Sequence, residues 1–507
     1  MMKKLISMLL VSVCTSVWAD ISPDAIFTSN MVLQRDKAVP IWGKASPGEK
    51  VVVEFAGQKV SGTTGTDGLW EVRLRPLKTC AEGRDLVIGP HRLENVVVGD
   101  VWLVSGQSNA EMSFAWGILN GDAEMEAAAK YPNVRSIKIE KKTSPFPIGS
   151  GTCNFGTWVV CNKETLGMVT AMGYFMAQEI NRQTGVPIGI LNDNWSGCRI
   201  EPFVSVEGMR MVPALADRVK EVEIRRREYL DWCKAVAAAK DEKALALVGP
   251  RPDNTDWTLQ HNAMIEPLVR FPIRGCAWYQ GCSNGGEGPE YVDKLRALVG
   301  GWRTKWGYDF PFYIVQLSSF TAKTDDPAGG NGYARTREAQ RIAAETIPNC
   351  GLAVTIDIGN ETDIHPKNKR DVGERIARWA LRDVYGQKDL VVSGPLFKEM
   401  KVVGNTAVIS FTHVGGGLMA GEKGPDTPGV KPVPSADGKL RGFSVKGQDG
   451  VWHWADAKIV GETVVLSAKG VDSPTAVRYA YRANPMGDCN LYNREGLPAS
   501  PFATDCW

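Results

Sequence analysis

The fold is decided by the stretch Val101-Trp102-Leu103-Val104-Ser105-Gly106-Gln107-Ser108-Asn109-Ala110-Glu111-Met112-Ser113. Its first half is an apolar run typical of a buried strand, and its second half is typical of the start of a helix. Ser108 is therefore expected in a turn between a strand and a helix. Such a turn holds a hydroxyl out of the sheet, beside the N–H groups that the first turn of a helix leaves unpaired.

Ser108 has two interpretations at this point. A serine in such a turn can be a nucleophile, because Gly106 lets the chain bend tightly and free N–H groups can hold a developing oxyanion. It can also cap a helix that begins near Glu111, since serine is a common N-cap. Gly-Gln-Ser-Asn differs from the Gly-x-Ser-x-Gly elbow of the α/β-hydrolases. Local spacing favours the cap, so the choice depends on whether a base occurs elsewhere in the chain.

The N-terminus has the pattern of a secretory signal peptide over residues 1–19. A basic start with Lys3 and Lys4 precedes a short apolar run, and Ala19 provides a small residue at the exit. This run is too short to remain as a membrane anchor, and no later stretch is apolar enough to span a bilayer. We therefore expect an exported protein, periplasmic or extracellular, without a membrane span.

Composition limits the partners that the chain can have. The chain of 507 residues has 59 basic and 57 acidic residues, so its net charge is only +2. A charge this small gives no strong attraction to nucleic acid, and we expect none as a partner. Nothing in the composition indicates the oligomeric state.

The chain contains eleven cysteines. Cys14 falls within the expected signal peptide, and the others could form disulfides in an exported protein. The closest-spaced candidate pairs are Cys153 with Cys161 and Cys489 with Cys506. Sequence alone does not fix the connectivity.

The chain divides into three parts after the signal peptide. Residues 20–98 have the short strand runs and turn sequences of a small β domain. From 99 to 393 strands alternate with helices, which predicts a mostly parallel sheet covered on both faces. A charged, alanine-rich helical stretch at about 206–251 is expected to be a solvated insertion, and β patterns resume over 394–507. Within the α/β part we expect strands at 134–139, 187–194, 312–317 and 352–356, and helices at 167–180, 291–302, 335–345 and about 367–385.

Polar segments follow several of the expected parallel strands. Ligands of open α/β sheets gather beyond the carboxyl ends of the strands, so these segments are expected to meet. They are the turn at Ser108 and the segments 193–201, 277–284 and 357–367.

His365 is the histidine that best fits a base for Ser108. A serine hydroxyl is a weak nucleophile until a neighbouring base takes its proton, and histidine is the usual choice. His365 stands in a polar loop, and Pro366 can start the next helix. The alternative is a buried histidine with a structural role. The other histidines lie in expected β regions or ahead of an expected strand: His91, His261, His413 and His453.

Two acids could orient the His365 imidazole. Asp363, two residues earlier, could hold the tautomer that accepts the serine proton and stabilise the imidazolium. It could equally be a helix cap. Asp357 is the reserve candidate for the same role.

Three blocks resemble the motifs of the sialate O-acetylesterase family, a branch of the SGNH hydrolases. They are Gly-Gln-Ser-Asn-Ala-Glu-Met at 106–112, Trp-Tyr-Gln-Gly at 278–281 and Asp-Ile-His-Pro-Lys-Asn-Lys at 363–369. Further matches lie at 31–35, 262–268 and 490–502, so the likeness covers nearly the whole chain after the signal peptide.

The resemblance implies a flavodoxin-like three-layer α/β/α core with N- and C-terminal β-sandwich-type domains. It implies a serine esterase that removes acetyl groups from sugars, first of all O-acetylated sialic acids, through an acetyl-serine intermediate and with no metal or cofactor. Two alternatives stay open. One is an acetylesterase for plant polysaccharides such as acetylxylan or pectin, and the other is a non-catalytic carbohydrate-binding protein on the same scaffold.

The family's site residues carry over to matching positions in this chain. The resemblance implies that Ser108 is the nucleophile and His365 the base. It implies an oxyanion hole built from the Ser108 amide, Gly197 and a side-chain amide, with Gln280 as the first choice and Asn284 as the second. Loss of one such donor typically raises the barrier by about 3 kcal/mol.

The chain departs from the family pattern at two cysteines. Cys198 and Cys282 stand where the family commonly has a threonine and a glutamate, in two loops expected to meet at the site. They could form a disulfide if their Cα atoms lie within about 7 Å of each other. The hypothesis is a Cys198–Cys282 bridge between the two loops, against two buried thiols.

Overall fold

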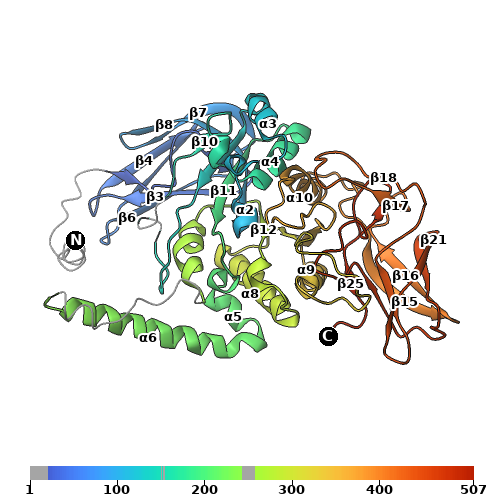
Figure 1. Ribbon diagram of the computed structural model, residues 1–507. Coiled ribbons are helices and arrows are strands. Elements are labelled where there is room, and N and C mark those ends of the chain that lie inside the picture. Colours follow the sequence, from blue (N-terminus) through green and yellow to red (C-terminus); the bar gives the residue numbers. More distant parts are fainter. Residues whose placement is uncertain (1–20, 150, 152–154, 242–256) are drawn as a thin grey trace.

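The computed structural model describes residues 21–149, 151, 155–241 and 257–507. The expected signal peptide and Cys153 lie outside the described residues. Figure 1 shows the N-terminal strands in blue and the C-terminal strands in orange to red, on opposite sides of a region that combines helices with parallel strands. The chain is therefore a mixed α/β protein with several sheets.

A parallel sheet forms the centre of the molecule. Strand β8 (His91–Gly106) lies in its middle, and its second half pairs with a parallel strand on each side. Strands β11 (Ile188–Asn194) and β12 (Gly275–Tyr279) are buried along their whole length, as expected for a parallel sheet covered on both faces. The order of the parallel strands is β9 (Val134–Lys138), β11 (Ile188–Asn194), β8, β12 (Gly275–Tyr279), β13 (Phe312–Val315) and β14 (Cys350–Ala353), with the short antiparallel β10 (Val159–Val160) beside β9.

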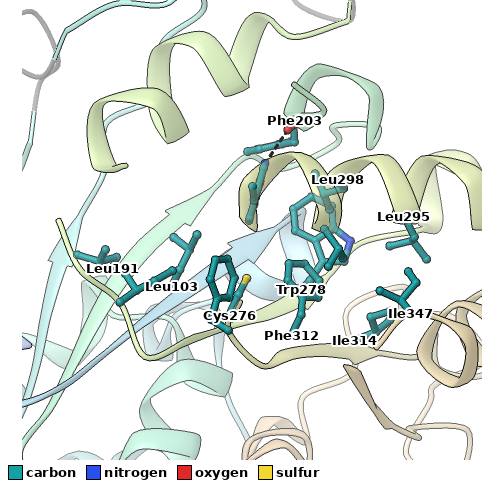
Figure 2. Close-up of a cluster of buried hydrophobic side chains, with 14 of the residues drawn as sticks. Leu103, Leu191, Phe203, Cys276, Trp278, Leu295, Leu298, Phe312, Ile314 and Ile347 are labelled. Carbon is teal, nitrogen blue, oxygen red and sulfur yellow. Dashed lines mark hydrogen bonds between the residues drawn. The ribbon is translucent and has the colours of Figure 1, made fainter. Parts of the chain in front are cut away.

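Helices cover the two faces of this sheet in pairs. Trp102 and Val104 of β8 lie in the core cluster shared with α4 (Ala171–Thr184) and α10 (Lys369–Asp383). Leu103 of β8 points the other way, into the cluster of α8 (Pro289–Trp306) and α9 (Ala334–Thr346). This alternation follows from the two-residue period of a strand. Figure 2 shows the second cluster, where strand side chains meet helix side chains: Leu103, Leu191, Phe203, Cys276, Trp278, Leu295, Leu298, Phe312, Ile314 and Ile347.

Four N-terminal strands, β2, β4, β5 and β7, belong to the same sheet as the parallel strands, whereas β1, β3 and β6 form a separate three-stranded sheet. The first half of β8 pairs with β7 and β2, so β8 runs through the expected boundary at residue 98. Asp100 of β8 is fully buried and ion-pairs with Arg35 and Arg274. The N-terminal strands are β1 (Ser22–Pro23), β2 (Val32–Gln34), β3 (Val39–Lys44), β4 (Lys50–Phe55), β5 (Gln58–Thr63), β6 (Leu69–Leu74) and β7 (Cys80–Ile88).

The C-terminal part consists of antiparallel strands in three small sheets. The first sheet has the order β15 (Leu396–Val403), β16 (Thr406–Thr412), β22 (Thr463–Ser467) and β21 (Asp456–Val460). The second has the order β20 (Trp452–Trp454), β19 (Phe443–Lys446), β23 (Ala476–Tyr479) and β25 (Phe502–Ala503). The third has the order β18 (Val433–Pro434), β17 (Leu418–Glu422) and β24 (Leu491–Asn493).

The structure describes two α-helices within the range of the expected insertion. They are α5 (Val206–Arg210) and the long α6 (Ala216–Ala238), which lies apart from the parallel sheet in Figure 1. Val222 is the buried residue of α6, so the helix is largely solvated. One expected helix begins later than predicted: α4 starts at Ala171, because the Thr170 side chain caps it by accepting from the Gly173 N–H. No described helix has the length and apolar character needed to cross a membrane.

Candidate active site

The turn that carries Ser108 depends on a glycine at the end of β8. Gly106 has φ +137°, and a Cβ at this position would lie 2.2 Å from the Tyr279 carbonyl oxygen of the neighbouring strand. A larger residue would push these two strands apart. Ser108 then begins the single-turn helix α2 (Ser108–Glu111), in which Gln107 occupies the N-cap position and no side chain makes a capping hydrogen bond. The interpretation of Ser108 as a helix cap is therefore wrong.

The structure brings His365 to Ser108. His365 Nε2 lies 2.8 Å from Ser108 Oγ, although the two residues are 257 positions apart in sequence. His365 comes from the loop between β14 and α10. Ser108 is buried, with 8% of its surface exposed, whereas the His365 side chain is 28% exposed. A serine hydroxyl within hydrogen-bonding distance of an accessible imidazole is the arrangement that an activated nucleophile requires.

The two candidate acids have different surroundings. Asp363 Oδ1 lies 3.6 Å from His365 Nδ1 and accepts the His365 backbone N–H at 2.8 Å. Asp357 instead pairs with Arg375, whose two terminal nitrogens lie 2.6 and 2.8 Å from its two carboxylate oxygens. Asp363 is therefore the acid beside the imidazole, and Asp357 belongs to a buried ion pair.

The surroundings of His365 favour its neutral form. Burial lowers the pKa of the imidazole, and the positive charges of Lys369 and Lys367 lower it further. Asp363 opposes them by raising the pKa, but the net direction is downward. A neutral imidazole can accept a proton, so these surroundings suit a general base at neutral pH.

Two backbone N–H groups remain available for an oxyanion. Within the described residues neither the Ser108 N–H nor the Gly197 N–H donates a hydrogen bond. The loop of Gly197 is held against α2, because the N–H and hydroxyl of Ser196 donate to Glu111 Oε2 at 2.9 and 2.6 Å. Gly197 has φ +73°, a left-handed conformation that favours glycine.

The side-chain amides expected in the oxyanion hole have other partners. Gln280 is fully buried, and its Nε2 donates to the Cys198 carbonyl at 3.2 Å and to Asn284 Oδ1 at 2.8 Å. Asn284 Nδ2 in turn donates to both carboxylate oxygens of Glu201, at 3.3 and 3.1 Å. In this structure neither amide is left free for an oxyanion, so its role in the oxyanion hole stays a prediction. Both groups are used to join the two loops.

The expected Cys198–Cys282 bridge does not form, and both residues are free thiols. Cys198 Sγ lies 3.7 Å from the Gly106 carbonyl oxygen, so its thiol is directed toward the nucleophile turn. Burial raises the pKa of Cys282 to about 11, so its thiol stays protonated at neutral pH.

Of the two pairs predicted from close spacing, the structure tests only Cys489 with Cys506, which is not bridged. Cys489 and Cys506 are also free, because Cys489 Sγ lies against the Ile356 carbonyl, whereas Cys506 Sγ lies near Glu338 and Ala503. Cys161 is described as a free thiol, whereas its expected partner Cys153 lies outside the described residues.

Sequence reasoning missed the roles of three residues of the site. Trp116 is 40% exposed, and its ring meets the His365 ring edge to face at 5.6 Å between centroids. Lys367 Nζ donates to the Trp116 carbonyl at 3.0 Å. Lys369 is fully buried under the site and donates to Asn109. The motif blocks include Lys367, Lys369 and Asn109, but the spacing of residues in a sequence does not predict that a lysine will be buried.

Comparisons with known proteins agree on one activity. No family model matches the chain. The curated sialate O-acetylesterase of Mus musculus is 27% identical over 517 residues, covering 93% of this chain and 92% of the mouse protein. The Homo sapiens protein of the same name is 26% identical, covering 96% of this chain and 94% of the human protein. A solved structure, a carbohydrate acetylesterase from Xanthomonas citri, is 33% identical and matches with a TM-score of 0.78, covering 96% of this chain and 100% of that chain.

Proposed function

We propose that this chain, which belongs to the sialate O-acetylesterase family of carbohydrate acetylesterases, is a serine esterase with Ser108 as its nucleophile. Membership of this family makes the chain a carboxylic ester hydrolase. The observation that carries the mechanism is the 2.8 Å distance from Ser108 Oγ to His365 Nε2. The proposed substrates are O-acetylated carbohydrates, with O-acetylated sialic acids as the first class.

The proposed reaction has two halves. In the first, His365 Nε2 takes the hydroxyl proton while Ser108 Oγ bonds to the acetyl carbonyl carbon, and the N–H groups of Ser108 and Gly197 hold the oxyanion. The bond to the sugar oxygen then breaks, and His365 returns its proton to that oxygen. In the second half a water molecule gives a proton to His365 while its oxygen bonds to the acetyl carbon. The bond from that carbon to Ser108 Oγ then breaks, His365 returns the proton to Oγ, and the acetic acid leaves as acetate and a proton released to solvent. Asp363 orients the imidazole throughout.

The strand order supports the finer fold assignment. Numbered along the chain without the edge strand β9, the order β11-β8-β12-β13-β14 becomes 2-1-3-4-5, which is the flavodoxin-like order. Ser108 follows β8, where the order reverses and ligands of such sheets bind. We infer an SGNH-type core over residues 99–393, flanked by β domains over 20–98 and 394–507.

The N-terminal sequence supports export, and we propose that residues 1–19 are removed as a signal peptide. Expression of the full chain in a secreting bacterial host, followed by N-terminal sequencing of the exported protein, tests this. The expected first residue is Asp20. Accumulation of uncleaved chain in the cytoplasm would contradict the proposal.

An acetate-release assay over a panel of substrates tests the function. The panel holds O-acetylated sialic acids, acetylated xylan and acetylated pectin, each at matched acetyl concentration. The proposal expects the highest kcat/KM on the sialic acids. Faster release from either polysaccharide would transfer the assignment to that substrate, and no release from any of them would favour a protein that binds sugars without catalysis.

Trp116 is expected to hold the sugar ring. An exposed indole beside the catalytic imidazole offers an apolar face on which a sugar can stack, while the acetyl group reaches Ser108. Loss of such an aromatic contact costs about 1 kcal/mol, which is about fivefold in affinity. Trp116→Ala should therefore raise KM for the acetylated sugar about fivefold.

The test measures KM of Trp116→Ala for the acetylated sugar and for ethyl acetate, which has no ring to stack on the indole. The change for ethyl acetate should be smaller, and Trp116→Phe should restore much of the sugar KM. Equal losses on both esters would mean that Trp116 acts on His365 and not on the sugar.

A further inference from the structure

Lys369 is an ammonium group buried directly beneath the catalytic pair. It is the first residue of α10 and is 0% exposed. Its Nζ donates to Asn109 Oδ1 at 2.6 Å and lies 5.4 Å from the centroid of the Tyr279 ring. No carboxylate in the described part of the chain lies within ion-pair distance of it. Burial of an amine without a carboxylate is costly, so this lysine needs an explanation.

Asn109 connects this lysine to both halves of the active site. An ammonium group only donates, so Lys369 fixes the amide of Asn109 with Oδ1 toward itself. The Nδ2 group of Asn109 is thereby turned toward the Ile364 carbonyl, to which it donates at 2.9 Å. Asn109 follows Ser108 in the chain, and Ile364 precedes His365. This pair of hydrogen bonds therefore joins the nucleophile turn to the loop of the base.

We propose that Lys369 is a positioning residue for the ester hydrolysis, holding the His365 loop against the Ser108 turn through Asn109 and placing a positive charge behind the imidazole that keeps it neutral. The proposal rests on the assignment of Ser108 and His365 as nucleophile and base. Lys369 touches neither the serine nor the substrate position, so its action passes through Asn109 and through the electric field at His365.

The charged groups around Lys369 and His365 determine how the proposed effect of Lys369 depends on pH. Asp363 and the ammonium groups of Lys367 and Lys369 act on His365. The Cys282 thiol, Lys367 and Asp363 act on Lys369, and burial is the largest influence, lowering the pKa of Lys369 to about 7. Lys369 therefore carries its charge below about pH 7, the range in which a histidine would otherwise take up a proton. Since each cation disfavours the other, protonation of His365 is postponed to lower pH.

The experiment compares Lys369→Met with the wild-type enzyme, because methionine fills similar space without the charge. The profile of kcat/KM against pH for p-nitrophenyl acetate should keep its acid limb in both enzymes, but the limb should move to higher pH in Lys369→Met. On the plateau above the limb, kcat should fall about 10- to 100-fold, because loss of the bridge misplaces the His365 loop by a fraction of an ångström to about 1 Å.

Two further variants separate the parts of the proposal. Asn109→Ala removes the bridge and keeps the buried amine, so its plateau should fall while its acid limb stays closer to that of the wild-type enzyme. Lys367→Met is the matched control for charge, since Lys367 is 37% exposed and solvent screens it. Its acid limb should move less than that of Lys369→Met. Lys369→Arg, which keeps a cation, replaces Lys369→Met if that variant does not fold, and its limb should stay in place.

A direct titration distinguishes failure of this inference from failure of the proposed function. The imidazole pKa of His365, followed by NMR and identified with His365→Gln, should be higher in Lys369→Met than in the wild-type chain, whether or not the enzyme accepts a given ester. An unchanged His365 pKa together with an unchanged acid limb would overturn the inference, even if the plateau and the melting temperature fell. A shifted pKa in a chain that hydrolyses no ester would overturn the proposed function alone.

Discussion

Replacement of Ser108 by alanine is expected to lower acetate release from p-nitrophenyl acetate and from acetylated sugars by at least about 10⁴-fold, since removal of a serine nucleophile in a comparable enzyme costs about 10⁶-fold in kcat. The side chain is small and makes no capping bond in α2. The variant should therefore fold and melt like the wild-type protein. Activity is lost because, in the part of the chain that the structure describes, no other hydroxyl hydrogen-bonds to the imidazole as Ser108 Oγ does at 2.8 Å.

A serine in the same segment provides the control for this variant. Ser113 is 7% exposed and lies just beyond α2. It makes no hydrogen bond to His365 in the described structure. Ser113→Ala should retain most of the wild-type kcat/KM. Near-normal activity in Ser108→Ala would remove the nucleophile from the mechanism and leave the site without its chemistry.

The second large effect is expected on stability, from Asp357→Ala. Arg375 and Asp357 have side chains only 8% and 2% exposed, and two short hydrogen bonds join them. Removal of the acid leaves a buried guanidinium without its counter-charge, which typically costs about 3–5 kcal/mol. Asp357 also accepts from the Tyr492 hydroxyl at 3.4 Å, so the loss extends to the contact with β24. Urea denaturation followed by tryptophan fluorescence should show a clearly lower midpoint.

Asp363→Asn is the matched variant for the other acid. The Asp363 side chain is 39% exposed and lies 3.6 Å from His365 Nδ1, so the protein should keep its unfolding midpoint. Activity should fall, by less than the about 10⁴-fold seen when a buried triad acid is replaced by its amide. An unchanged midpoint in Asp357→Ala, or a large stability loss in Asp363→Asn, would reverse the assignment of the two acids.

Many helices and strands could be predicted from the sequence because their signals are local. The buried run that ends at Gly106 predicts a strand, and the structure confirms one up to that residue. Helices α8, α9 and α10 begin within a few residues of their predicted starts, since periodicity and capping residues are read from neighbouring positions. The juxtaposition of Ser108 and His365 was also expected, because the carboxyl ends of parallel strands meet at one edge of a sheet.

The roles of the acids and amides could not be predicted in this way. Asp357 and Asp363 are both acids in one loop, and what separates them is Arg375, which lies 18 residues after Asp357 on the buried side of α10. Gln280 and Asn284 both carry a suitable amide, but they donate to groups on another loop, the Cys198 carbonyl and the Glu201 carboxylate. A side chain takes the partners that packing brings to it, and sequence spacing does not record them.

The sequence by itself determined the alternation of strands and helices, the turn that carries Ser108 and the histidine that meets it, because these depend on patterns within short segments and on one general property of parallel sheets. Only the tertiary structure decided which acid lies beside the imidazole, that Cys198 and Cys282 are free thiols, and that Lys369 is buried beneath the site. Each of those outcomes depends on which side chains are buried and on contacts with residues from distant segments. Burial and contacts of this kind arise only when the helices pack against the sheet.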